Sequence, residues 1–302
     1  MRFPSLDDLL GHSRALSGLL DGAQRMAESD GTILILGEAG SGRSTLARAL
    51  HHASPRAHAA LVEVDPGTIP ASLFEGELFG YEAGAFTGAE HSSPGRVARA
   101  AGGTLLLDHI EELPLAVQPK LLRLLAERRY ASLGGRERDA DVRIIAVAAS
   151  DLAFRVEKSL FRSDLYYRLD VLTLSLPALK ERRDEIGAIA KGMVADLAER
   201  LGRRAPELAP QALEWMMAYE WPGNLRELRN VLEHTLILSS GEPLNPPPRR
   251  SGAAPPRPLT ELEEEAIRQA LAHTGGRQGR AAELLGISRK TLWKKRRQYG
   301  IP

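Results

Sequence analysis

One stretch near the N-terminus, residues 32–45, constrains the fold more than any other part of the chain. An apolar, β-branched run, Ile33–Leu36, is followed by a glycine-rich turn and then by a helical pattern, Leu46–His52. This order of strand, loop and helix is typical of a phosphate-binding loop. The glycines let several backbone N–H groups point at one anion, and the helix N-terminus adds its dipole. A simple strand-to-helix turn needs no ligand, but here four elements of the motif are in register.

The residues of this loop form the candidate nucleotide site. Ser44 stands where a hydroxyl would bind Mg²⁺, and Arg43 stands where the motif requires Lys. A planar guanidinium does not fit among the β- and γ-phosphates as a compact ammonium does. The predicted nucleotide-binding residues of the loop are Gly37, Glu38, Ala39, Gly40, Ser41, Gly42, Arg43, Ser44 and Thr45.

Apolar runs recur along the first half of the chain, and helical patterns separate most of them. These runs are Ile33–Leu36, Leu61–Val64, Thr104–Leu107, Val142–Ala148 and Val171–Leu176. The alternation predicts a parallel α/β sheet with helical crossovers in a first domain, residues 1–176. Asp108 directly follows one of the runs. An acid at such a strand end can bring a carboxylate to Mg²⁺ beside a phosphate-binding loop.

After Pro177 the pattern becomes helical, and a second domain is expected at residues 177–238. Helices are predicted at Glu185–Leu201, Ala209–Tyr219 and Asn224–Leu238. Residues 239–258 contain seven Pro in twenty, which indicates a semi-extended linker before a third domain, residues 259–302.

The third domain has the pattern of a helix-turn-helix. Thr260 and Glu263 form a capping box, Gly286 stops a second helix, and Ser288 begins a third. Although the net charge is only +1, the last helix, Arg289–Tyr299, carries six basic side chains and no acid, so the rest of the chain carries about −5. The predicted DNA contacts are Ser288, Arg289, Lys290, Thr291, Lys294, Lys295 and Arg297.

One residue of the last helix does not fit this pattern. Arg296 follows Leu292 by four residues and lies on the face that should pack inward. Either this packing is loosened or the arginine extends its charged end to water.

Composition excludes several other classes of protein. The chain has no Cys, which excludes disulfides and thiolate metal sites. It has no apolar run of membrane-spanning length and no signal-peptide pattern. A cytoplasmic protein without membrane partners is therefore expected.

Three further motifs carry a resemblance to a known family. Residues 84–89 read GAFTGA after an ELFG lead-in, residues 161–169 read FRSDLYYRL, and residues 221–228 read WPGNLREL. In these motifs, and over nearly the whole length from Leu10 to Ile301, the chain resembles the AAA+ activators that work with sigma-54, the bacterial enhancer-binding proteins. No receiver or sensory domain is expected before residue 10, so control is expected to act in trans or through expression.

The resemblance implies a fold and a set of partners. The expected fold is a P-loop AAA+ α/β domain with a helical lid, followed by an all-α Fis-like helix-turn-helix. The implied cofactors are ATP and Mg²⁺, with Ser44 and Asp108 as metal ligands. The implied partners are the sigma-54 RNA polymerase holoenzyme, double-stranded DNA, and other subunits in a homo- or hetero-oligomeric, typically hexameric, ring.

The resemblance also assigns roles to single residues. Arg162 and Arg168 resemble arginine fingers that reach the nucleotide of a neighbouring subunit, and Arg226 resembles the lid arginine that senses the γ-phosphate. The sigma-54 contact is expected at Gly84, Ala85, Phe86, Thr87, Gly88 and Ala89. Within this loop, Phe86 offers an apolar side chain for the contact. A loop Phe without such a partner usually packs against its own domain.

Four positions depart from the family pattern, and all belong to hydrolysis. Arg43 replaces the loop Lys, His109 replaces the Glu after Asp108, Ala149 replaces a polar Asn, and Asp65 replaces another Asn. A general base is typically worth 10²–10⁴-fold in rate. The two changes at 65 and 109 suggest a new carboxylate–imidazole contact, although drift would explain them as well.

The sequence leaves the activity open. One alternative is a slow ATPase that uses Arg43 and His109. Another is a hydrolysis-deficient subunit that binds nucleotide and acts with a competent activator, and a third is an antagonist that occupies DNA and sigma-54 without remodelling. Nucleotide binding is better supported than normal hydrolysis because the loop, Ser44, Asp108 and Arg226 are retained.

Overall fold

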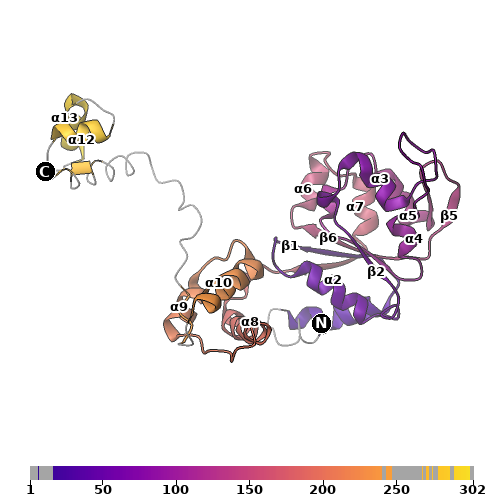
Figure 1. Cartoon of the computed structure of the whole chain (residues 1–302), viewed down its shortest axis with the longest axis horizontal. Coiled ribbons are helices and arrows are strands. Elements are labelled where there is room, and N and C mark those ends of the chain that lie inside the picture. The colour runs from indigo at the N-terminus through magenta and orange to yellow at the C-terminus, as the bar shows by residue number, and fades with distance from the viewer. Residues whose placement is uncertain are drawn as a thin grey trace. The chain divides into compact units, whose positions relative to one another are not determined.

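The structure, a computed structural model, describes most of the chain in two units. It describes residue 6, residues 16–239 and 243–246, and residues 267, 270, 271, 274, 278–285 and 289–299. The units are Met1–Arg249 and Arg250–Pro302, and each is considered by itself (Figure 1). Of the helices that the structure describes, none is long and apolar enough to cross a membrane.

A five-stranded parallel sheet forms the centre of the first unit. Its strand order is β2-β3-β6-β1-β7. The strands are β1 (Ile33–Gly37), β2 (Leu61–Val64), β3 (Thr104–Leu107), β6 (Arg143–Ala149) and β7 (Leu172–Leu176). This result confirms the predicted parallel α/β fold. The position of β1 between β6 and β7 brings its carboxyl end, where the phosphate-binding loop starts, next to the ends of both strands.

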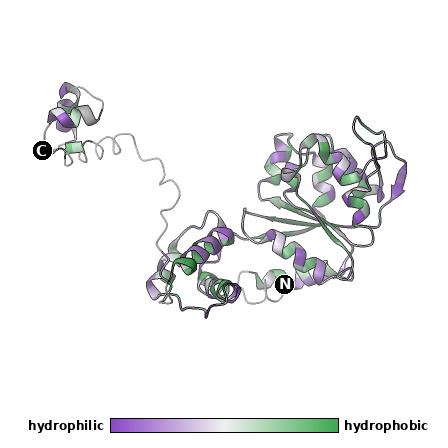
Figure 2. Cartoon of the chain, in the orientation of Figure 1, coloured by the Kyte–Doolittle hydropathy of each residue, from purple (hydrophilic) through white to green (hydrophobic). Residues whose placement is uncertain are grey.

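Helices cover both faces of the sheet because successive side chains of each strand point to opposite sides. Ile33 and Ile35 pack with α1 (Ser17–Glu28) and α2 (Arg43–His52) on one face. Leu34 lies in a second core on the other face. The helices of this second face are α3 (Ala71–Phe79), α4 (Gly95–Arg99), α5 (Gln118–Glu127), α6 (Leu152–Glu157) and α7 (Ser163–Leu169). Figure 2 shows the apolar strands between the helices that cover the two faces of the sheet.

A short antiparallel hairpin, absent from the sequence predictions, joins the α/β domain. It consists of β4 (Arg129–Ala131) and β5 (Glu137–Asp139). β5 consists of charged residues only and β4 has just three residues, so neither shows the apolar alternation that identifies a strand. The hairpin supports the GAFTGA segment, since Tyr81 bridges to both Ser93 and Leu133.

The lid is helical, as predicted. Two 3₁₀ turns, η4 (Leu179–Glu181) and η5 (Arg183–Glu185), lead into α8 (Ile186–Arg200), α9 (Pro210–Ala218) and α10 (Asn224–Leu238). The three α-helices enclose a core of their own around Trp221, which is fully buried.

The lid packing continues into the segment that we expected to be a linker. Leu244 is 0% exposed and pairs with Leu208, and the Trp215 indole donates a hydrogen bond to the Pro246 carbonyl at 2.9 Å. The first residues of this Pro-rich stretch therefore belong to the lid core. The division of the chain into four segments, at 176/177, 238/239 and 258/259, remains a prediction.

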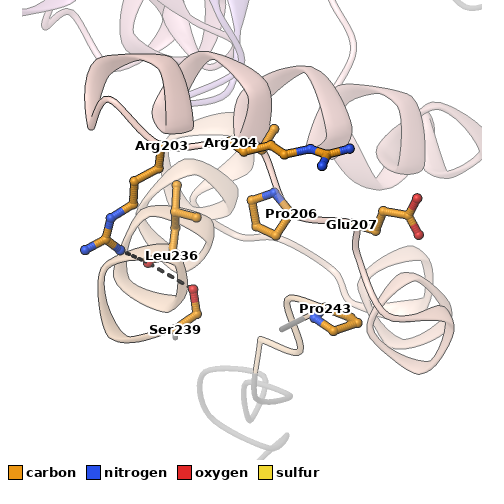
Figure 3. A pocket seen from close by; sticks show the side chains of 8 residues that line it. Arg203, Arg204, Pro206, Glu207, Leu236, Ser239 and Pro243 are labelled. Carbon is orange, nitrogen blue, oxygen red and sulfur yellow. Dashed lines mark hydrogen bonds between the residues drawn. The ribbon is translucent and has the colours of Figure 1, made fainter. Parts of the chain in front are cut away.

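A pocket of about 690 Å³ lies at the end of the lid (Figure 3). Arg203 and Glu207 line it from the α8–α9 connection, and Leu236 and Ser239 line it from the end of α10. Leu236 lies about 18 Å along the helix from Asn224, at the start of α10. The pocket is therefore distinct from the phosphate-binding loop, which Asn224 contacts.

The second unit contains two described helices, α12 (Gln278–Leu284) and α13 (Arg289–Gln298). Ile267, Ala281 and Leu292 belong to its small core. Arg296 is partly exposed, and its buried Nε has no hydrogen-bond partner among the described residues, which is consistent with a side chain that extends out of the core. The predicted capping box and turn fall outside the described residues.

Candidate functional site

The phosphate-binding loop joins the end of β1 to the start of α2. Gly40 and Gly42 adopt positive φ angles of 77° and 103°, which residues with a Cβ rarely adopt. At Gly40 a Cβ would also lie 2.4 Å from the Gly223 carbonyl oxygen of the lid. The loop therefore makes a tight turn where it meets the lid. It leads directly into α2, whose N-terminus is suited to bind an anion.

Two oxygen ligands meet beside this helix N-terminus. The Ser44 hydroxyl donates a 2.6 Å hydrogen bond to Asp108 Oδ2. Asp108 is held at the end of β3, where its backbone N–H bonds the Val64 carbonyl. The structure thus brings together the two side chains that the sequence predicts as metal ligands.

Arg43 lies buried in the loop without a direct counter-ion. The residue is 5% exposed, and its Nη1 has no hydrogen-bond partner in the part of the chain that the structure describes. Burial lowers the pKa of its guanidinium, and the negative charges of Glu111 and Asp108 oppose this shift. The Ser41 hydroxyl is buried and unpartnered as well.

These residues fit a bound nucleotide phosphate. A buried cation and a hydroxyl that lack partners are unfavourable unless an anion or water satisfies them. Free N–H groups at the start of α2 add donors for the same anion. The Ser44 and Asp108 oxygens are of the hard type that Mg²⁺ prefers. Bound Mg²⁺ would neutralise phosphate charge, and this chain would hold it through these two side chains.

The predicted carboxylate–imidazole contact is present. His109 Nδ1 lies 3.1 Å from Asp65 Oδ2, and the other Asp65 oxygen accepts a 2.9 Å hydrogen bond from the Gly67 N–H. Both side chains are about one-third exposed. His109 has a φ of 51°, a left-handed conformation that His tolerates better than most residues. This turn directs the imidazole toward the end of β2 and away from β6.

Sequence reasoning missed Glu111. It is 7% exposed, and its Oε1 accepts a 3.1 Å hydrogen bond from the Ala149 N–H at the end of β6. No motif marks it, and a Glu near a second acid reads as an ordinary polar turn. A buried carboxylate therefore occupies the neighbourhood of Ala149, where the family pattern places an amide.

Asn224 connects the lid to the phosphate-binding loop. Its side chain is fully buried and donates hydrogen bonds to Glu38 Oε2 at 3.1 Å and to the Ala39 carbonyl at 3.0 Å. Its Oδ1 accepts a 2.7 Å bond from the Leu179 N–H. The sequence predicted Asn224 only as part of a motif and gave it no role.

Arg226 lies close to this junction. A Cβ on Gly40 would come within 3.2 Å of the Arg226 Cβ, and the charge of Arg226 contributes to the lowered pKa of Arg43. The next contact is a 3.0 Å hydrogen bond from the Leu225 N–H to the Gly40 carbonyl. The lid therefore brings a second cation to the loop of the same chain.

The two predicted arginine fingers lie elsewhere. Arg162 and Arg168 are exposed at the start and along α7. Arg162 forms a bidentate ion pair with Asp164, at 3.0 and 2.7 Å, and this hydrogen bonding raises the pKa of Arg162. Arg168 donates to the Leu125 carbonyl. Within the described part of the chain, neither has a hydrogen bond to the phosphate-binding loop.

The GAFTGA segment forms a projecting loop. A 2.8 Å hydrogen bond from the Gly84 N–H to the Ala89 carbonyl closes its base. Phe86 is 45% exposed, with its ring centroid 5.0 Å from that of Tyr81 in an edge-to-face contact. Thr87 is exposed beside it. The Phe86 ring thus packs against Tyr81 on one side and remains partly exposed to solvent.

Part of the predicted DNA surface is described. Arg289 and Lys294 are exposed on α13, and Thr291 and Lys295 on the same helix are partly exposed. Lys290 and Arg297 belong to α13, but their side chains fall outside the description, and Ser288 is not described at all.

Together, the parallel sheet, phosphate-binding loop, strand-end acid and docked helical lid define a AAA+ nucleotide-binding protein. Three family models agree along the chain: the sigma-54 interaction domain over residues 9–175, the AAA+ ATPase lid domain over 180–247, and the Fis-family bacterial regulatory protein over 258–299. The chain belongs to the sigma-54-dependent transcriptional regulators, as its motifs predicted.

Individual relatives match over almost the whole chain. The alginate biosynthesis transcriptional regulatory protein AlgB of Pseudomonas aeruginosa is 42% identical over 306 residues, which cover 98% of this chain and 68% of AlgB. The DNA-binding transcriptional activator HyfR of Escherichia coli is 41% identical, covering 98% of this chain and 48% of HyfR.

Solved structures resemble the fold as well. NtrX from Brucella abortus in complex with ATP is similar with a TM-score of 0.73 and 31% identity, over 97% of this chain and 69% of that one. The ADP complex of the same protein gives a TM-score of 0.74 and 32% identity, with the same coverage.

We predict that Asn224→Ala destabilises the protein by about 2–4 kcal/mol, because it leaves buried polar partners unsatisfied and puts Ala at a positive φ. The free energy of unfolding in urea measures this loss. Asn230→Ala is the matched control, because Asn230 is exposed on the same helix and its loss should cost no more than about 0.5 kcal/mol. Equal losses of stability in the two variants would contradict the conclusion that the Asn224 side chain holds the lid to the phosphate-binding loop.

The Asp65–His109 contact is expected to give a coupling energy of about 0.5–1 kcal/mol, as for a partly exposed hydrogen-bonded pair. The measurement is a double-mutant cycle of Asp65→Ala, His109→Ala and the combined variant, followed by unfolding in urea. The cycle cancels the separate loss of the Asp65–Gly67 hydrogen bond. Strictly additive effects would show that the contact contributes nothing.

Proposed function

We propose that this chain regulates sigma-54-dependent transcription as a nucleotide-binding protein that holds ATP or ADP with Mg²⁺ in the phosphate-binding loop. The observation that carries this proposal is the unpartnered, buried cation of Arg43 beside the paired oxygens of Ser44 and Asp108. The ATP and ADP complexes of NtrX support a nucleotide at this fold. Arg226 would contact the same nucleotide from the lid.

The proposed activity is binding with weak hydrolysis. His109 is turned toward Asp65, and Ala149 has no polar side chain to orient a water molecule. Neither residue offers the carboxylate base at the family position. A subunit that retains nucleotide in this way would act with a competent activator, or would occupy its targets without remodelling them.

The remaining predicted residues complete this proposal. Phe86 and Thr87 would contact sigma-54 in the polymerase holoenzyme, and the basic face of α13 would contact double-stranded DNA. Arg162 and Arg168, exposed on α7, would reach the nucleotide of a neighbouring subunit in a ring. The protein would act in the cytoplasm.

Restoring the family residues is expected to restore turnover. We predict that the combined Arg43→Lys and His109→Glu variant releases phosphate from ATP at least about 10²-fold faster than the unmodified protein, since a positioned base is typically worth that factor. Binding of ATP should change far less than turnover. Arg48→Lys is the control, because Arg48 lies on the same helix but pairs with Glu63. If the unmodified protein already matches the restored one, its hydrolysis is not impaired.

Loss of the loop aromatic is expected to remove the sigma-54 contact. We predict that Phe86→Ala weakens binding to purified sigma-54 by roughly tenfold or more, because central aromatic residues dominate interface energies. The measurement is equilibrium binding in the presence of ATP and Mg²⁺. Phe154→Ala is a matched control, since Phe154 is similarly exposed on α6, at 54% against 45% for Phe86. Equal losses in both variants would contradict a specific role for the loop.

A further inference from the structure

Glu111 is a buried acid with one unsatisfied oxygen. Its Oε1 bonds the Ala149 N–H, whereas Oε2 is buried and has no hydrogen-bond partner among the described residues. A buried carboxylate oxygen without a partner is strongly unfavourable unless an opposite charge lies near it. The surroundings of Glu111 should therefore contain a cation or a ligand.

The backbone fixes the position of this carboxylate. The left-handed turn at His109 ends β3, and η3 (Ile110–Glu112) starts immediately after it. Arg155 holds the turn through a 3.3 Å bond to the Glu111 carbonyl. Glu111 consequently reaches Ala149, which pairs in register with Gly37, the last residue of β1. The acid lies at the sheet edge from which the phosphate-binding loop begins.

Arg43 is the matching cation. It too is buried with an unpartnered nitrogen, and no carboxylate of the described residues lies within 4.0 Å of it. Arg43 begins α2 directly after the phosphate-binding loop, and that loop starts at Gly37, beside the Ala149 that Glu111 bonds. Two opposite charges, each with a buried atom that lacks a partner among the described residues, thus lie at the same end of the sheet without a direct ion pair between them.

We propose that Glu111 is the internal counter-charge of Arg43 and competes with nucleotide phosphate for it. This inference rests on the proposed nucleotide binding and deepens it. A phosphate that binds at the loop is attracted by Arg43 and repelled by Glu111. The repulsion grows with the charge and reach of the phosphate chain, so Glu111 disfavours a triphosphate more than a diphosphate. Glu111 is thereby a specificity-determining residue that shifts the site toward ADP.

The test compares nucleotide affinities without any turnover. Calorimetric titration of the full chain with ADP and with the β,γ-imido analogue of ATP, both with Mg²⁺, gives two dissociation constants for each variant. Glu111→Gln should tighten binding of the triphosphate analogue by roughly tenfold and of ADP by a smaller factor. Gln retains the oxygen that accepts from Ala149, so the fold should be preserved.

A neighbouring acid provides the control. Glu112→Gln removes the same charge one residue further along, from an exposed side chain that lies 3.8 Å from Arg155. It should leave both affinities unchanged. The proposal is overturned if Glu111→Gln leaves the ratio of the two affinities unchanged, or if Glu112→Gln shifts it equally.

A second measurement needs no nucleotide. Thermal unfolding midpoints of Arg43→Gln, Glu111→Gln and the combined variant form a double-mutant cycle. Each residue compensates the buried charge of the other. The unfolding midpoint of the combined variant should therefore fall by less than the sum of the falls in the two single variants. Additive shifts overturn the counter-charge. If neither the unmodified chain nor Glu111→Gln binds nucleotide, the proposed function fails as well, whereas unchanged binding in Glu111→Gln rejects only the competition.

Discussion

The Asn224 carboxamide ties together the three segments on which the nucleotide site depends. One buried side chain bonds Glu38 and Ala39 in the phosphate-binding loop and Leu179 at the entrance to the lid. The loop cannot change its shape without breaking these bonds or moving α10 with it. Since the loop is where a phosphate would bind, the lid position and the state of the site are mechanically linked. The close approach of Gly40 to Gly223 leaves no room for a Cβ at position 40, so this contact between loop and lid depends on the glycine.

Much of the fold was predictable because it depends on simple periodicities. Each of the five parallel strands is a mostly apolar run of four to seven residues, and α10 begins and ends at the residues that the sequence indicated. The helical lid and its breakers at Pro and Gly were equally visible. The charged hairpin β4–β5 was not, since alternating charges give no apolar face. Leu244 was hidden for the opposite reason: a single leucine among prolines reads as linker, although it is completely buried.

The site was predictable where a motif fixes it and unpredictable where only the tertiary structure brings residues together. Ser44 and Asp108 are 64 positions apart, and their side chains form a 2.6 Å hydrogen bond. Their motifs predicted this closeness, because each follows a strand of the same parallel sheet. The Asp65–His109 contact followed from two simultaneous departures from the family pattern. Glu111 had no such signal. Its relation to Arg43 arises from a left-handed residue and a short 3₁₀ turn, which no periodicity reveals.

The changed residues of the site have a common electrostatic meaning. Replacing a compact ammonium by the larger guanidinium of Arg43 puts a cation deep in the loop, and its burial requires a nearby negative charge. The position after Asp108, where a carboxylate would help to hydrolyse ATP, carries His109 instead, and its imidazole pairs with Asp65. Glu111, an acid buried at the same end of the sheet, is anchored on the Ala149 N–H. In the proposed arrangement, negative charge balances Arg43 and is missing from the position after Asp108, where it would activate water. On this proposal the site would be stable when it is empty and would favour the nucleotide that carries less charge.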